Sequence, residues 1–130
     1  MIADTSFIID LMRKNAAAQD KLNEIEKNSE SQYTTSPTVF ELSTGIALSN
    51  WPEKEKNKVE ELLSQFSVIH FSENHAFVSG RILGTLYKQG NPIDPVDAQI
   101  AGIAIVEEEK IITRNAKHFE RIHGVRFELY

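Results

Sequence analysis

The stretch 98–105 is apolar on nearly every side. Only Gln99 and Gly102 interrupt a run of alanine and isoleucine. A helix of this composition has no face that suits water, so it must lie inside the molecule. Pro95 has the fixed φ that suits a first helical turn, and Asp94 directly before it is a good N-cap. The sequence therefore predicts a buried helix that begins at Pro95.

Asp97 stands in the first turn of this predicted helix. An acid in a first turn interacts favourably with the helix dipole, and that capping role is our interpretation of Asp94. For Asp97 the same role is a poorer explanation, because an unpaired carboxylate inside the protein is costly. We expect a positive charge to meet it.

The composition is that of one soluble globular domain of 130 residues, with 41% hydrophobic and 25% charged residues. The absence of cysteine excludes disulfides, thiolate metal sites and a cysteine nucleophile. Asp4 and Asp10 interrupt the only apolar stretch near the N-terminus, and no run reaches transmembrane length. We therefore expect a cytoplasmic protein without a membrane partner. The net charge of −5 argues against nucleic-acid binding by bulk charge, but is compatible with an enzyme that gathers acids around metal ions.

Short apolar strands alternate with helices along the chain. The predicted strands are 1–4, 33–35, 67–71, 111–113 and 125–129, and the predicted helices are 7–13, 16–27, 36–50, 53–65, 72–88, 95–105 and 115–119. We expect Thr5 and Ser6 to cap the first helix. Core positions are expected at Val39, Phe40, Leu42, Ile46 and Leu48 in the third helix, and at Ala76, Leu83 and Leu86 in the fifth. This alternation predicts an α/β domain with a parallel sheet and helices on both faces.

Two further acids have settings that bear on function. Asp4 ends the first strand directly before a helix, which is a usual place for ligand-binding groups in parallel sheets, although a capping role explains it equally well. Glu41 lies in a mostly apolar helix, where base rates favour a solvated position. If both converged with Asp97, the carboxylates would raise one another's pKa unless cations neutralised them. Oxygen ligands without sulfur or paired histidines indicate Mg²⁺ or Mn²⁺. Spacing alone does not establish that the three converge.

Three motifs carry a resemblance to a known family. They are Ile2-Ala3-Asp4-Thr5-Ser6 at the start, Pro92-Ile93 with Asp97 and Ile100-Ala101-Gly102-Ile103-Ala104 in the middle, and Ile112-Thr113-Arg114-Asn115 with Phe119 near the end. In order, spacing and length the chain resembles the PIN-domain nucleases, and most of all the VapC-type toxins of prokaryotic toxin–antitoxin pairs. The resemblance spans essentially the whole chain. It implies one PIN-like, three-layer α/β/α domain over residues 1–130, with a central, mostly parallel sheet of four or five strands.

The resemblance also implies a site, residue by residue. Asp4, Glu41 and Asp97 match the first three motif acids, which the family places around one or two Mg²⁺ or Mn²⁺ ions to cleave RNA endonucleolytically. Many members carry a fourth acid after the late threonine. Here that position holds Asn115, whose neutral oxygen is expected to support the metal or a water molecule. His118 stands where some relatives carry another acid, and we give it no ligand role.

Other residues are expected to support the acids and the RNA. Thr5, Ser6 and Thr113 are small hydroxyl residues beside the motif acids, suited to positioning a carboxylate or a water molecule. Arg114 is our first choice for an RNA phosphate contact; the other candidates are Arg13, Lys14, Arg81 and Lys117. The resemblance implies a homodimer, and a cognate antitoxin that fills the active-site groove and often inserts an arginine among the acids.

Two other interpretations stay open at this point. The asparagine at the fourth position is compatible with a catalytically silent PIN-like scaffold that binds RNA or protein. An aspartyl phosphotransferase of the haloacid-dehalogenase kind would need a second aspartate two residues after Asp4, where this chain has Ser6. That departure gives the phosphotransferase interpretation little weight.

Overall fold

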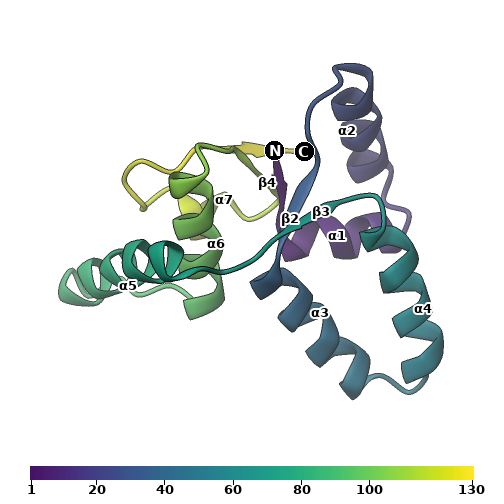
Figure 1. Ribbon diagram of the computed structural model, residues 1–130, viewed down its shortest axis with the longest axis horizontal. Coiled ribbons are helices and arrows are strands. Elements are labelled where there is room, and N and C mark those ends of the chain that lie inside the picture. Colours follow the sequence, from purple (N-terminus) through teal and green to yellow (C-terminus); the bar gives the residue numbers. More distant parts are fainter.

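A five-stranded parallel sheet forms the centre of the structure. The computed structural model describes residues 1–130 (Figure 1). The strands are β1 (Ile2–Ala3), β2 (Tyr33–Thr35), β3 (Ser67–Ile69), β4 (Ile111–Thr113) and β5 (Phe127–Leu129). The helices are α1 (Thr5–Met12), α2 (Ala16–Lys27), α3 (Ser36–Leu48), α4 (Pro52–Leu63), α5 (Glu73–Lys88), α6 (Pro95–Val106) and α7 (Ala116–Phe119). These elements confirm the predicted order and the α/β class.

The strand order, β3-β2-β1-β4-β5, places the first strand in the middle of the sheet. Ile2 pairs with Tyr33 of β2 on one side and with Ile111 of β4 on the other, and every pairing in the sheet is parallel. The chain therefore winds away from β1 in both directions. In such sheets, ligands bind outside the carboxyl ends of the strands at the point where the order reverses. That point is the end of β1, where Asp4 lies.

Alternate residues of the central strands face two separate helical layers. Ala3 and Ile112 belong to a core with side chains of α1, α2, α3 and α4, whereas Ile2 and Ile111 belong to a core with side chains of α5, α6 and α7. This follows from the two-residue side-chain period of a strand. Figure 1 shows the two groups of helices on opposite sides of the strands. The three-layer α/β/α arrangement is confirmed.

Helix α6 is the buried helix that its sequence predicted. Asp94 is its N-cap and accepts a hydrogen bond from the Val96 backbone N–H at 2.8 Å. Buried positions then follow in almost continuous succession: Ala98, Ile100, Ala101, Gly102, Ile103 and Ala104. Helix α5 packs against it closely at Gly102, where an added Cβ atom would lie 2.0 Å from Ser79 Oγ. The capping interpretation of Asp94 and the interior position of α6 are both confirmed.

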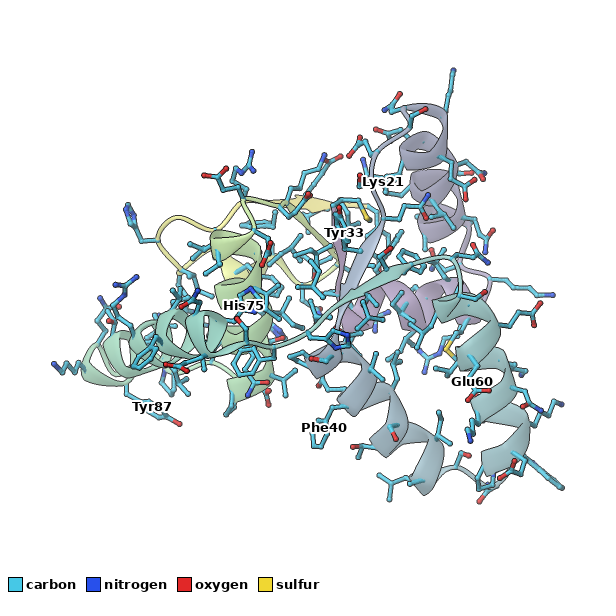
Figure 2. All side chains as sticks on the ribbon, viewed as in Figure 1. Lys21, Tyr33, Phe40, Glu60, His75 and Tyr87 are labelled. Atoms are coloured by element: carbon cyan, nitrogen blue, oxygen red, sulfur yellow. The ribbon has the colours of Figure 1, made fainter.

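Three core assignments were wrong. Phe40 and Leu48 of α3 are 66% and 82% exposed, and Ala76 of α5 is also exposed. In α3 only Pro37, Thr38 and Leu42 are buried, because the helix leans on the sheet with its first turns and then runs outward beside α4 (Figure 1). Figure 2 shows Phe40 projecting from that helix. The apolar side chains on its outer part therefore have no second layer to cover them.

The cap of the first helix also differs from expectation. Asp4 is the N-cap of α1, and the helix already begins at Thr5. Thr5 and Ser6 are thus residues of the first turn rather than caps. A carboxylate caps a helix at least as well as a hydroxyl, so Asp4 serves this structural role whatever else it does.

Candidate active site

Asp4 is buried at the carboxyl end of β1, with only 4% of its surface exposed. Its Oδ1 atom accepts hydrogen bonds from the Phe7 backbone N–H at 2.8 Å and from the Ser6 hydroxyl at 2.7 Å. Burial raises the pKa of this carboxyl; hydrogen bonds from Thr113, Phe7 and Ser6 oppose the shift, and the charge of Glu41 adds to it. Asp4 therefore carries a negative charge that the protein alone does not fully compensate.

Glu41 is held at the site by threonines from two elements. The Thr5 hydroxyl of α1 donates to its Oε1 at 2.5 Å and lies 3.4 Å from the Thr38 hydroxyl of α3. Thr38 is itself fixed by Thr35 at the end of β2, which caps α3 and accepts from the Thr38 N–H at 3.2 Å. Glu41 is half-buried rather than solvated. Thr5 thus contacts Glu41, whereas Ser6 contacts Asp4.

Asp97 lies against a basic side chain, the imidazole of His118. His118 on α7 places Nδ1 at 2.8 Å from Asp97 Oδ2, and the Asp97 side chain is 17% exposed. Burial raises the pKa of Asp97 to about 6; His118 opposes that shift, and the charges of Asp94, Glu41 and Asp4 add to it. The contact gives His118 a role beside a motif acid that no local sequence signal predicts.

The three motif acids lie in one electrostatic environment. Glu41 raises the pKa of Asp4, and both Glu41 and Asp4 raise the pKa of Asp97. The fold therefore brings together residues from the end of β1, from α3 and from the start of α6. The side chains do not close into a ligand set, since no three His, Asp or Glu residues are arranged to hold a metal ion among themselves. Their chemistry, three carboxylates without sulfur, still fits a hard divalent cation.

The late motif closes the edge of the site from β4. Thr113 is fully buried; its Oγ1 accepts from the Asn115 backbone N–H at 3.0 Å and lies 3.5 Å from the Ser6 hydroxyl. The Arg114 backbone N–H donates to Ser6 Oγ at 3.3 Å, and its side chain pairs with Asp10 at 2.6 Å. That side chain remains 45% exposed. The Arg114 guanidinium is thus anchored at one nitrogen and accessible to solvent.

Asp10 and Tyr130 are residues of this region that the sequence analysis missed. Asp10 is 4% exposed, and its Oδ2 accepts a hydrogen bond from the Tyr130 hydroxyl at 2.8 Å. One signal was available for Asp10, because it follows Ser6 by four residues and so lies on the same face of α1. No sequence signal connects Tyr130 to residues more than a hundred positions away.

A groove of about 520 Å³ runs from the site between α1, α3 and α4. Its lining includes Met12, Arg13, Glu41, Ile46 and Val59. Besides apolar side chains, its lining holds two acids, Glu41 and Glu55, and two cations, Arg13 and Lys58. The groove can therefore accept an extended, partly apolar segment, and a positive charge on that segment would meet Glu41.

When metal is absent, the folded protein is expected to lose stability as the pH rises from 4 to 6. The pKa of Asp97 is about 6 when folded, against an ordinary value of 3.8, so the folded state binds more protons in this window. The free energy of unfolding should therefore fall as pH rises, by about 1–2 kcal/mol after allowance for partial exposure.

The variant Asp97→Asn lacks this titration and serves as the comparison. The other titratable groups around Asp97 are the same in both proteins; they are His118, Asp94, Glu41 and Asp4. Urea unfolding with chelator at several pH values should give curves that diverge from pH 4 to pH 6. Parallel curves would show that Asp97 does not have the raised pKa.

The whole fold matches one known family. Residues 1–125 match the sequence profile of the PIN domain. The chain is 31% identical over 121 residues to a tRNA(fMet)-specific endonuclease VapC of Shigella flexneri, covering 93% of this chain and 89% of that protein. It is 30% identical to ribonuclease VapC2 of Haemophilus influenzae, covering 96% of this chain and 93% of that protein. The chain belongs to the PIN-domain family, and within it to the VapC ribonucleases.

Solved VapC structures agree with this assignment. The crystal structure of VapBC2 from Rickettsia felis, bound to a DNA fragment from its promoter, matches with a TM-score of 0.91 and 26% identity over 99% of this chain and 97% of that one. As a VapC ribonuclease, the chain is an endonuclease of the hydrolase class. It is the toxin component of a toxin–antitoxin system. This confirms the family and activity predicted from the three motifs. None of the helices of this VapC-family chain has the length and apolar character needed to span a bilayer.

Proposed function

We propose that this chain cleaves RNA with Mg²⁺ or Mn²⁺ held by Asp4, Glu41 and Asp97. The observation that carries the proposal is that Asp4 and Asp97 are buried beside Glu41 at the carboxyl edge of the sheet, where burial, with a smaller addition from neighbouring acids, raises their pKa values. None of the three acids pairs with a lysine or an arginine, and the one basic side chain against them is the imidazole of His118, beside Asp97. A divalent cation would neutralise the remaining charge, and oxygen donors suit Mg²⁺ and Mn²⁺.

A bound divalent ion supplies a nucleophilic water molecule at neutral pH and stabilises charge on the phosphate. The residues of the chain would orient these partners. Ser6 and the Phe7 N–H hold Oδ1 of Asp4 and so would fix the orientation of this carboxylate toward the ion. Thr5 fixes Glu41 through Oε1. One of the three carboxylates would accept the proton released during attack.

Asn115 and Thr113 would complete the site from β4. The hydroxyl of Thr113 accepts from the backbone N–H of Asn115 and so fixes the start of α7. The neutral amide of Asn115 adds no charge, in contrast to the fourth acid of many relatives. We propose that its oxygen supports the metal or a water molecule, so the chain relies on Asp4, Glu41 and Asp97 for binding energy.

Arg114 is proposed to contact an RNA phosphate through the part of its guanidinium that remains exposed. The Arg114→Ala variant should bind RNA several-fold more weakly, with the salt dependence of binding reduced by about one phosphate contact. Binding can be measured by fluorescence anisotropy in the presence of chelator, so that cleavage does not interfere. Lys54→Ala, which removes an exposed cation on α4, is the matched control. Equal affinity and salt slope for wild type and Arg114→Ala would disprove the contact.

Transfer RNA is the substrate class that we propose, because relatives from two bacteria are named tRNA(fMet)-specific endonucleases. The test is incubation of the purified protein with initiator tRNA and with an elongator tRNA, in Mn²⁺, Mg²⁺ or chelator. We expect a discrete cut that requires metal. Binding without any cleavage would favour the silent scaffold, and cleavage that persists in chelator would disprove the metal dependence.

An antitoxin is the proposed protein partner, since the structural neighbours include VapBC complexes. We propose that it lies in the groove between α1, α3 and α4 and brings an arginine to the acids, as a carboxylate cluster is a good receptor for a guanidinium.

We also propose a homodimer, supported by exposed apolar side chains at Phe40, Leu48, Trp51, Phe77 and Tyr87. Figure 2 shows Phe40 and Tyr87 projecting from α3 and α5. Size-exclusion chromatography with light scattering should give twice the chain mass; a single chain mass would disprove the dimer.

A further inference from the structure

Asp10 is a buried carboxylate beside the site that belongs to none of the motifs. It lies one helical turn after Ser6 on α1, so the two side chains share a face. Its Oδ1 atom receives Arg114 Nη1 at 2.6 Å, and its Oδ2 receives the Tyr130 hydroxyl at 2.8 Å. Both oxygens therefore have strong donors, which is what a buried charge requires.

Tyr130 is held in place by packing as well as by this hydrogen bond. Its ring meets the Phe7 ring edge-to-face, with centroids 4.8 Å apart and planes at 64°. Burial and the neighbouring Asp10 carboxylate raise the pKa of Tyr130, so its hydroxyl remains a donor throughout the physiological range. Phe7 also supplies the backbone N–H that binds Asp4. Tyr130 thus contacts the first turn of α1 from beneath the site.

Arg114 connects this buried pair to the first motif acid. While its side chain is fixed by Asp10, its backbone N–H donates to Ser6 Oγ at 3.3 Å. Ser6 in turn donates its hydroxyl proton to Asp4 Oδ1 at 2.7 Å. A movement of Arg114 would remove the donor that orients the Ser6 hydroxyl. The orientation of the Asp4 side chain therefore depends in part on Arg114, acting through Ser6, and in part on the Phe7 N–H that binds the same oxygen.

We propose that Asp10 and Tyr130 are positioning residues, which fix Arg114 and, through its backbone and Ser6, hold Asp4 in the orientation that binds the metal. The inference rests on the proposed metal-dependent function and deepens it. Partners beyond the direct metal ligands orient those ligands, and their loss commonly lowers metal affinity or activity by 10- to 100-fold. Neither Asp10 nor Tyr130 is hydrogen-bonded to any of the three motif acids, so their effect must pass through Arg114 and Ser6.

The variant Tyr130→Phe tests this most cleanly, because it removes one hydroxyl and keeps the ring against Phe7. We expect the Kd for Mn²⁺, measured by calorimetry on the RNA-free protein, to rise about 10-fold. We expect kcat to fall by a similar factor, with a smaller change in the KM for RNA, because Asp10 keeps its ion pair with Arg114 in this variant. Asp10→Asn should have a larger effect, and Tyr130→Phe remains decisive if Asp10→Asn does not fold.

Glu107→Gln is the matched control. It weakens another close contact of a buried side chain, between His75 Nε2 and Glu107 Oε1 at 2.7 Å, near the far end of α6 from Asp97. We expect it to lower stability while Mn²⁺ affinity and kcat stay at wild-type values. If Tyr130→Phe keeps the wild-type Mn²⁺ affinity and kcat, the positioning role is overturned while the proposed function stands. Equal changes in Tyr130→Phe and Glu107→Gln would have the same meaning. A wild-type protein that neither binds Mn²⁺ nor cleaves RNA would instead overturn the proposed function, and this inference with it.

Discussion

Asp4→Asn is expected to lose RNA cleavage by about 1,000-fold or more and yet to be more stable than the wild type when metal is absent. The asparagine oxygen can still accept hydrogen bonds from Phe7 and Ser6, so the cap of α1 survives. What disappears is the buried carboxylate of Asp4, whose pKa is raised by burial and by the charge of Glu41. Because the Asp4 charge is costly without a cation, its removal should raise the Tm in chelator by several degrees.

Asp94→Asn is the matched control for this experiment. Asp94 also caps a helix through its side chain, but it is exposed at the start of α6. We expect full cleavage activity and a stability change well under about 1 kcal/mol, since asparagine caps as well as aspartate. Cleavage by both variants would show that Asp4 acts only as a cap, and a loss of stability in Asp4→Asn would show that the Asp4 charge does not destabilise the metal-free protein. Activity can be scored as new RNA 5′ ends in vitro and as growth arrest on induced expression.

Gly102→Ala is expected to destabilise the protein by about 1–3 kcal/mol through overpacking between α5 and α6. A Cβ atom at this position would lie 2.0 Å from Ser79 Oγ and 3.0 Å from both the Cβ and the backbone nitrogen of Ser79. The hydroxyl could rotate away, but the backbone of α5 cannot move without disturbing the core on that side of the sheet. Urea unfolding of the two proteins measures the difference directly.

The control for Gly102→Ala is Gly84→Ala in the same helix pair. Gly84 lies inside α5, and a Cβ there would meet nothing within 4 Å. Alanine should therefore stabilise that helix by about 0.5–1 kcal/mol, through its better helix propensity. Opposite signs for the two variants are the expected result. A Gly102→Ala protein as stable as the wild type would mean that α5 and α6 are not packed this closely.

Most of the fold was accessible from the sequence because local signals agreed with the tertiary arrangement. The pair Asp94-Pro95 marks the first residue of α6, and the strand-like runs 33–35 and 111–113 are β2 and β4 without a shift. The exposure of Phe40 and Leu48 could not be predicted in the same way. Their helix continues beyond the sheet that it packs on, and that is a property of element lengths in space rather than of local pattern.

The site divides along the same line. Asp4 stands at a strand end and Asp97 in the first turn of a helix, so both positions carry a local signal, whereas Glu41 lies inside α3 and is proposed only from the motif resemblance. The contact of His118 with Asp97 and the network of Asp10, Arg114 and Tyr130 join segments that only the strand order makes neighbours. Apart from the four-residue spacing of Ser6 and Asp10, no local signal marks these contacts.

The central claim is that Asp4, Glu41 and Asp97 together bind a divalent cation. The most direct test is a crystal of the protein grown or soaked with Mn²⁺ and examined by anomalous scattering, with an Asp97→Asn crystal treated identically. The account predicts an anomalous peak among the three carboxylates in the wild type, and its loss or strong reduction in the variant. A wild-type map without a peak there, or a peak of equal height in both crystals, would contradict it.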